Sequence, residues 1–105
     1  MASQLKAWIS IVLILGMGSI PARAETIRVT IEKMVFTPAV ITAKVGDRIE
    51  WINKDIVDHT ATVKDGWDVV ISSGKAATLQ LEQAGSVDFY CRFHPNMKGR
   101  IAVIP

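Results

Sequence analysis

The stretch GSVDFYCRFHPNMKGRIAV, residues 85–103, places an unusual group of side chains between two strand-like patterns. It holds the only cysteine of the 105-residue chain and one of its two histidines, and two residues separate Cys91 from His94 and His94 from Met97. Val87 and Phe89 alternate with polar residues before the cysteine, and the closing residues read as a short strand. A short loop between two adjacent strands can turn the thiol, the imidazole and the thioether toward one point.

The same two-residue alternation continues through the chain upstream of this stretch. In ETIRVTIE, residues 25–32, the isoleucines and the valine fall on one face and charged or hydroxyl residues on the other. A Gly46-Asp47 turn and an Ala84-Gly85 turn each separate two further strands. Because β-branched residues dominate and no segment of ten or more residues keeps a helical period, seven or eight short strands are expected, which predicts an all-β sandwich.

The segment 1–24 has the pattern of a cleaved secretory signal peptide. Lys6 precedes an uncharged, largely apolar run from Ala7 to Ile20, and Ala22-Arg23-Ala24 has the small-residue form that signal peptidase accepts. A retained anchor is the alternative, but this run of about 14 residues is shorter than the roughly 20 that a spanning helix needs. We therefore expect a periplasmic protein with one domain, residues 25–105, and no membrane span in the mature chain.

The net charge of +2 belongs to this first segment. Two of the 12 basic residues, Lys6 and Arg23, lie in it, so residues 25–105 carry ten basic and ten acidic residues. A nearly neutral domain gives no indication of a nucleic-acid partner.

The single cysteine cannot form an internal disulfide. In an oxidising compartment its thiol is unprotected unless something occupies it. A domain as short as the segment 25–105 is also near the lower size at which one core holds a fold without help. The alternative is a buried Cys91 that acts only as a small apolar residue.

The second histidine, His59, lies well before Cys91 in the chain, in NKDIVDHTATV, residues 53–63. An isolated histidine there would be read as a surface or capping residue, but every His and Cys of the chain falls in this segment or in the loop at residues 91–97. A thiolate with two imidazoles favours copper, zinc or iron, and a thioether suits copper better than zinc. Three strong ligands with a long axial Met form the blue-copper arrangement.

Two segments together resemble the cupredoxins, the small copper proteins that include plastocyanin, pseudoazurin and amicyanin. They are GDRIEWINKDIVDHTATV, residues 46–63, and residues 85–103, and the resemblance extends from Glu25 to Pro105. The Cys-x-x-His-x-x-Met spacing is similar to the short loop of amicyanin, since plastocyanin and pseudoazurin have two more residues before the Met. The resemblance implies a Greek-key β-sandwich and one copper ion per chain. It implies these ligands: His59, Cys91 and His94 in the equatorial plane and Met97 as the axial ligand.

Two positions beside His59 depart from the cupredoxin pattern. Plastocyanin and amicyanin have Asn directly after the first ligand histidine, where it helps to fix the ligand cysteine, whereas this chain has Thr60. Thr60 still offers a backbone N–H and a hydroxyl, so we expect the site to survive with altered surroundings that tune its potential. Many relatives have Pro before that histidine; here Asp58 either raises the basicity of His59 or is a solvated loop acid. The mature chain also lacks the N-terminal extension of amicyanin.

The resemblance implies single-electron transfer and no enzyme activity. Electrons would pass at His94, whose ring edge in cupredoxins emerges through an apolar patch; Phe93, Pro95 and Met97 could form it here. Redox proteins, as donor and acceptor, would dock there briefly, and we expect a monomer. In short-loop relatives the exposed histidine can leave Cu(I) and take up a proton, which predicts a pH-dependent potential. The sequence names neither the donor nor the acceptor.

Other functions remain as alternatives. A periplasmic copper carrier or storage protein would use the same ligands and hand over the ion. A thiol enzyme with Cys91 as nucleophile and a histidine as base does not explain Met97. A copper oxidase would need a His-x-His pair, and the sequence has none.

Several other residues have simple structural interpretations. Met34 is expected to pack in the core or at a sheet edge, and Trp51 in the core. Arg92, Lys98 and Arg100 surround the loop and either are solvated or favour an acidic partner.

Overall fold

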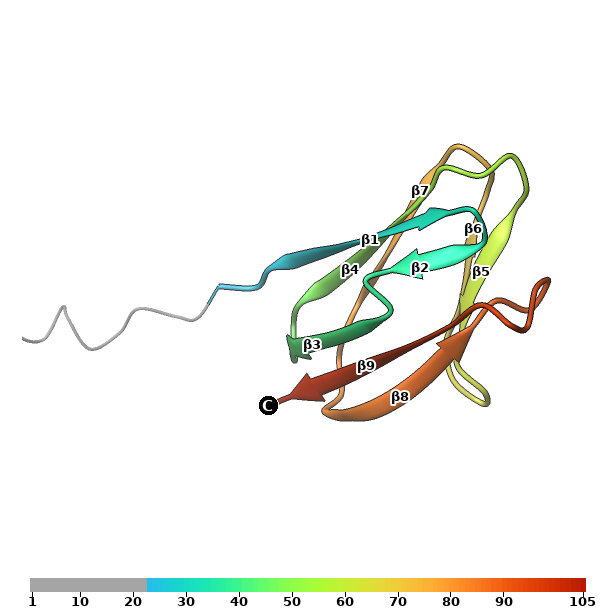
Figure 1. The fold of residues 1–105 in the computed structure, drawn as a ribbon. Coiled ribbons are helices and arrows are strands. Elements are labelled where there is room, and N and C mark those ends of the chain that lie inside the picture. Colours follow the sequence, from blue (N-terminus) through green and yellow to red (C-terminus); the bar gives the residue numbers. More distant parts are fainter. Residues whose placement is uncertain (1–22) are drawn as a thin grey trace, which may run out of the picture.

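The computed structural model describes residues 23–105, which form two β-sheets packed face to face (Figure 1). The predicted signal peptide, residues 1–24, lies outside the described residues except for its last two. The first sheet has the order β2-β1-β4-β7: β1 (Thr26–Glu32), β2 (Val35–Thr37), β4 (Arg48–Asn53) and β7 (Ala76–Gln80). The second has the order β3-β9-β8-β5-β6: β3 (Val40–Lys44), β5 (His59–Thr62), β6 (Asp68–Ile71), β8 (Gly85–Tyr90) and β9 (Lys98–Ile104).

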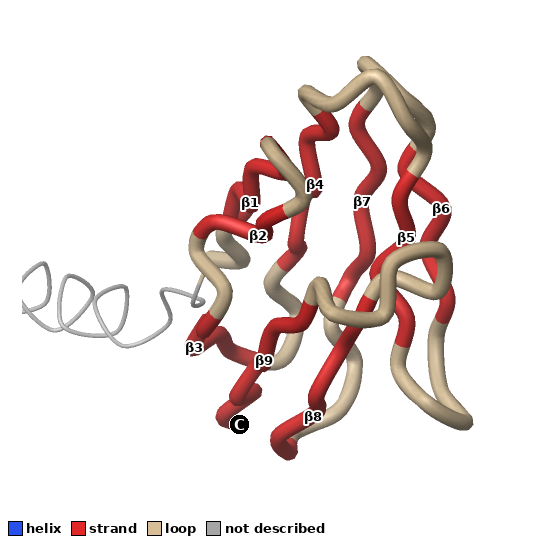
Figure 2. The backbone as a smooth tube through the Cα atoms, turned by 45° about the vertical axis from the view of Figure 1, so that its right-hand side comes forward, coloured by secondary structure: helices blue, strands red, loops and turns tan. Residues whose placement is uncertain are grey.

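The predicted all-β sandwich is confirmed, and Figure 2 shows only strands and loops in the described part of the chain. Residues 23–105 contain nine strands where seven or eight were expected. The difference arises because β2 and β6 have only three and four residues, too short to show a period of two. No helix within residues 23–105 has the length and apolar character needed to cross a membrane.

The core lies between the two sheets and follows the alternation of the strands. Val29 and Ile31 of β1 and Trp51 of β4 have no exposed surface, and Phe89 of β8 faces them from the other sheet. The Trp51 and Phe89 rings meet edge to face with centroids 6.1 Å apart. Each such side chain contributes about 1.5–3 kcal/mol by leaving water. The prediction that Trp51 belongs to the core is confirmed, and this core supports the loop that starts at Cys91.

The predicted turn at Gly46 and Asp47 also joins the start of β1 to the rest of the sandwich. Gly46 has a φ of 97°, which a residue with a side chain rarely adopts. The Asp47 carboxylate accepts 2.9 Å hydrogen bonds from the backbone N–H groups of Glu25 and Lys44. These two N–H groups, Glu25 first, lower the pKa of Asp47 below its usual range.

The loop between β8 and β9 lies at the end of the sandwich opposite the C-terminus (Figure 1). The turn between β1 and β2 and the loop between β4 and β5 reach the same end, since Met34 lines a hollow with His94 and hydrogen bonds join Lys33 and Met34 to Asp55. Three connections from both sheets therefore surround the predicted ligands.

Candidate metal centre

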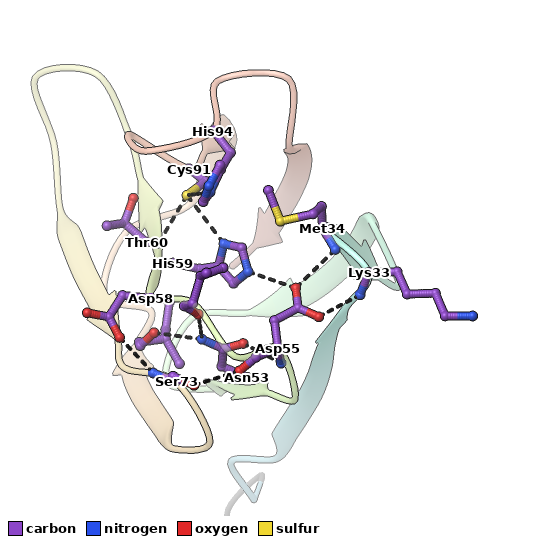
Figure 3. A network of polar contacts seen from close by, with 12 residues as sticks. Lys33, Met34, Asn53, Asp55, Asp58, His59, Thr60, Ser73, Cys91 and His94 are labelled. Carbon is purple, nitrogen blue, oxygen red and sulfur yellow. Dashed lines mark hydrogen bonds and ion pairs between the residues drawn. The ribbon is translucent and has the colours of Figure 1, made fainter.

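The sandwich brings His59, Cys91 and His94 together. His59 begins β5, Cys91 directly follows β8, and both side chains have no exposed surface, while His94 is half-buried. The Cys91 Sγ lies 3.7 Å from Nδ1 of His59 and 3.6 Å from Nδ1 of His94. The two imidazole rings meet at 62° with centroids 5.0 Å apart. Figure 3 shows the three side chains pointing toward one another, from the start of β5 and from the loop after β8.

These separations fit a shared metal ion. Metal–nitrogen and metal–sulfur bonds of about 2.0 and 2.3 Å, arranged around a trigonal centre, put the nitrogen and sulfur atoms roughly 3.6–3.8 Å apart. The ligand atoms of the three residues all lie within 4.8 Å of one another. One thiolate and two imidazole nitrogens suit copper, and a thioether in the same loop would add a soft axial donor.

Backbone hydrogen bonds fold the loop at residues 91–97 into a compact turn. The His94 N–H donates to the Cys91 carbonyl at 3.2 Å, and the Met97 N–H donates to the His94 carbonyl at 2.9 Å. The Cys91 N–H donates back to the Met97 carbonyl at 3.1 Å. The repeated spacing of three residues therefore matches two successive turns, and Met97, only 4% exposed, is held in the same loop.

A carboxylate fixes the orientation of the His59 ring. The Asp55 Oδ2 lies 2.8 Å from Nε2 of His59. Because an ionised carboxylate only accepts hydrogen bonds, Nε2 carries the proton and Nδ1 presents its lone pair toward Cys91. Asp55 thus selects the tautomer that a metal site needs.

Asp55 is itself held by the tight turn between β1 and β2. Lys33 and Met34 have φ values of 55° and 64°, which are uncommon for residues other than glycine. Their backbone N–H groups donate to the two Asp55 oxygens at 2.7 and 3.0 Å (Figure 3). Burial alone would raise the pKa of Asp55, but the hydrogen bonds from Met34, His59 and Lys33 lower it. The carboxylate therefore stays ionised beside His59.

The loop that carries Asp55 is organised by Asn53 at the end of β4. The buried Asn53 side chain donates to the carbonyls of Val57 and Ile71 at 2.8 and 3.0 Å, and its Oδ1 accepts the Asp55 N–H at 2.9 Å. Asp58 instead accepts the Ser73 N–H at 2.8 Å (Figure 3). The carboxylate that contacts His59 is thus not Asp58, which the sequence singled out, but Asp55.

Thr60 performs both roles expected of it. Its N–H donates to the Cys91 Sγ at 3.4 Å, and its hydroxyl accepts the Arg92 N–H at 2.8 Å. The position after His59 therefore still contacts the cysteine and the residue that follows it.

The surface around His94 differs in part from the expectation. Phe93 is 51% exposed and Pro95 is exposed, whereas Met97 is only 4% exposed and reaches the surface only in a hollow beside His94. Met34, expected in the core or at an edge, lies in the β1–β2 turn, is 39% exposed and lines a hollow beside His94. Together with Pro95, which lines the same hollow, Met34 adds apolar surface beside His94.

Two of the three basic residues near the loop are paired within the chain. Arg92 contacts Asp68 at 2.9 Å, and Nε of Arg100 lies 3.8 Å from Asp88. Both charges are therefore already paired with carboxylates of this chain and give no indication of an acidic partner protein.

Comparisons with known proteins agree with this geometry. Amicyanin from Paracoccus versutus is 29% identical over 87 residues, 76% of this chain and 66% of that protein. Amicyanin from Paracoccus denitrificans is 30% identical over 82 residues, 71% of this chain and 63% of that protein. The matched part thus spans slightly less than two thirds of these relatives' length.

Solved amicyanin structures share the fold. The Paracoccus versutus protein superposes with a TM-score of 0.68 at 29% identity, covering 81% of this chain and 85% of that chain. The reduced Cu(I) form of an amicyanin variant at pH 4 gives a TM-score of 0.69 at 28% identity, covering 81% and 86%. A family model described as a cupredoxin-like domain matches residues 5–103. Because this match extends over most of the chain, the chain belongs to the cupredoxin-like domain family.

Proposed function

We propose that this protein transfers single electrons at one copper ion, which His59, Cys91, His94 and Met97 would hold. The observation that carries the proposal is the placement of two imidazole nitrogens 3.6 and 3.7 Å from one buried thiol. Membership of the cupredoxin-like family and similarity to amicyanin structures, one described as a Cu(I) form, support the choice of copper. Bound copper would supply the Cu(II)/Cu(I) couple.

The protein's own contribution is a rigid and partly dry site. His59 and Cys91 have no exposed surface; β5 and the end of β8 position them, and the Asp55 carboxylate holds the His59 ring. A site fixed in this way needs little rearrangement when its charge changes, which favours rapid electron transfer. His94 is the half-buried ligand, so its ring is the point of closest approach for a partner.

We further propose that redox proteins dock transiently on the apolar surface formed by Met34, Phe93 and Pro95 around His94. Small interfaces of this kind suit brief redox encounters. The protein would act as a monomeric periplasmic electron carrier and not as an enzyme. The donor and the acceptor would both be redox proteins.

The test is a visible absorption spectrum of protein purified from expression of the full chain and titrated with Cu(II), with Cys91→Ala as control. We expect an intense thiolate-to-copper band that bleaches reversibly with a mild reductant and is absent from the control. Copper bound only as Cu(I), without such a band, would contradict electron transfer and favour the copper carrier.

A further inference from the structure

A closed ring of hydrogen bonds joins the residue after His59 to the residue after Cys91. The Arg92 N–H donates to the Thr60 hydroxyl at 2.8 Å, and the Thr60 and Thr62 hydroxyl oxygens lie 2.9 Å apart. The Thr62 hydroxyl donates to Asp68 Oδ1. The Arg92 side chain returns to the same carboxylate, with Nε 2.9 Å from Oδ1 and Nη2 3.0 Å from Oδ2. The ring thus starts and ends on Arg92.

The hydrogen bonds run from Arg92 donors to the Asp68 carboxylate along both arms of the ring. The Thr62 hydroxyl donates its proton to Asp68, because an ionised carboxylate only accepts hydrogen bonds. The Thr60 hydroxyl must therefore donate to the Thr62 oxygen while it accepts from the Arg92 N–H. Each hydroxyl therefore both accepts and donates, an arrangement in which successive hydrogen bonds strengthen one another. The Arg92 guanidinium, followed by the Thr62 hydroxyl, holds the pKa of Asp68 below its usual range, so the carboxylate that terminates the chain stays charged.

The ring ties two strands that are otherwise weakly paired. In the described part of the chain, β5 and β8 are matched by a single residue pair, Thr62 with Tyr90. Beyond that pair, toward the metal centre, the side-chain hydrogen bonds of the ring join the two strands in place of backbone pairing. Thr60 and Cys91 have no exposed surface, whereas the Arg92 and Asp68 side chains are 40% and 42% exposed. The ring therefore runs from the buried thiol to the protein surface.

We propose that Thr62, Asp68 and Arg92 are positioning residues that hold the Thr60 N–H against the Cys91 sulfur. The inference rests on the proposed function for its redox consequence. A hydrogen bond to the sulfur stabilises negative charge on the thiolate and so favours the reduced, more electron-rich site. A looser ring weakens this hydrogen bond and lowers the reduction potential.

Two variants weaken the ring at different points. Thr62→Val removes the hydroxyl at nearly constant size, and Asp68→Asn removes the charge at constant shape. Thr62→Ser, which keeps the hydroxyl, is the rescue variant. Asp88→Asn is the matched control, because Asp88 also faces an arginine but is 80% exposed and lies outside the ring.

The first measurement is amide hydrogen exchange in the metal-free protein. We expect the Arg92 and Thr60 amides to exchange on the order of tenfold faster in these two variants, because the ring that holds their hydrogen bonds is weakened. The Trp51 amide in the core should keep its rate, and Thr62→Ser and Asp88→Asn should match the wild type. Unchanged exchange at Arg92 and Thr60, or an equal acceleration at Trp51, would overturn the proposal.

The second measurement is the copper-loaded spectrum and reduction potential of the same proteins. We expect a shifted thiolate band and a lower potential in Thr62→Val and Asp68→Asn only. Faster exchange without any shift in band or potential would overturn the assignment of the ring to Cys91. If the wild type shows no thiolate band, the proposed electron-transfer function fails, and the exchange rates alone then decide whether the ring holds Thr60.

Discussion

Replacing Asp55 with asparagine removes one charge from beside the His59 ring and keeps the size of the side chain. Asp55 Oδ2 accepts hydrogen bonds from His59 and Met34, and Oδ1 accepts one from Lys33. An amide with its oxygen toward His59 keeps two of these bonds as neutral ones and loses the third, because its NH₂ group cannot accept.

The expected loss of stability follows from the number of hydrogen bonds that the variant keeps and loses. A hydrogen bond to a charged group contributes about 1.5–3 kcal/mol and a neutral one about 1 kcal/mol, while water replaces the lost acceptor at the exposed Lys33 N–H. We therefore expect Asp55→Asn to lower the free energy of unfolding of the metal-free protein by about 1–4 kcal/mol. Carboxylates that orient a ligand histidine typically change metal affinity by about 10–100-fold, so copper affinity should fall within that range.

Competition titration with a chelator of known copper affinity measures the change in copper affinity, and urea unfolding measures the change in the free energy of unfolding. Asp58→Asn is the control, since Asp58 contacts the Ser73 N–H and not His59. The control should bind copper as the wild type does. Wild-type affinity in Asp55→Asn, or an equal loss in Asp58→Asn, would refute the role assigned to Asp55.

Three further predictions concern the fold and its metal. Gly99→Ala should lower stability by about 1–3 kcal/mol in urea unfolding, because its Cβ would overlap the Phe89 ring and lie 2.8 Å from the Ala39 carbonyl oxygen; an unchanged midpoint would contradict this packing. Asp47 has a lowered pKa in the fold, so its contribution to stability is present above the ordinary carboxyl pKa of about 3.9 and is lost as pH falls through the lowered value. Asp47→Asn should therefore be less stable than the wild type at pH 7, with a difference that narrows below about pH 4, and a constant difference in urea midpoints would count against this account. Copper at about 100 times its dissociation constant should stabilise the wild type by about 2.7 kcal/mol in thermal unfolding, and an equal rise in Cys91→Ala would show that the ion binds elsewhere.

The architecture was predictable because its signals are local. Alternation places Val29, Ile31 and Trp51 inward in both sequence and structure, and Gly46 marks a turn that needs a positive φ. The spacing of Cys91, His94 and Met97 likewise reflects the backbone of one short loop. The shortest strands escaped prediction, because three or four residues carry no measurable period.

The residues that hydrogen-bond the candidate ligands were harder to predict, because they depend on which loop residue turns inward. Asp55 and Asp58 are both acids shortly before His59, and adjacency in sequence favoured Asp58. Asn53 reverses that order: it accepts the Asp55 N–H and bonds the Val57 carbonyl, so the loop turns Asp55 toward the histidine.

The residues around Cys91 were hard to predict for the same reason. Asp68 is distant from Cys91 in sequence, yet the antiparallel pairing of β5 with β6 places it opposite Thr62. The pairing of β5 with β8 then brings Thr62 opposite Tyr90, next to Cys91 and Arg92. Two separate strand registers must both be known before the Thr60–Arg92 contact can be inferred. A single-residue shift in either register would put Thr62 and its partner on opposite faces of the sheet and open the ring, so the surroundings of Cys91 depend on how β5, β6 and β8 are paired.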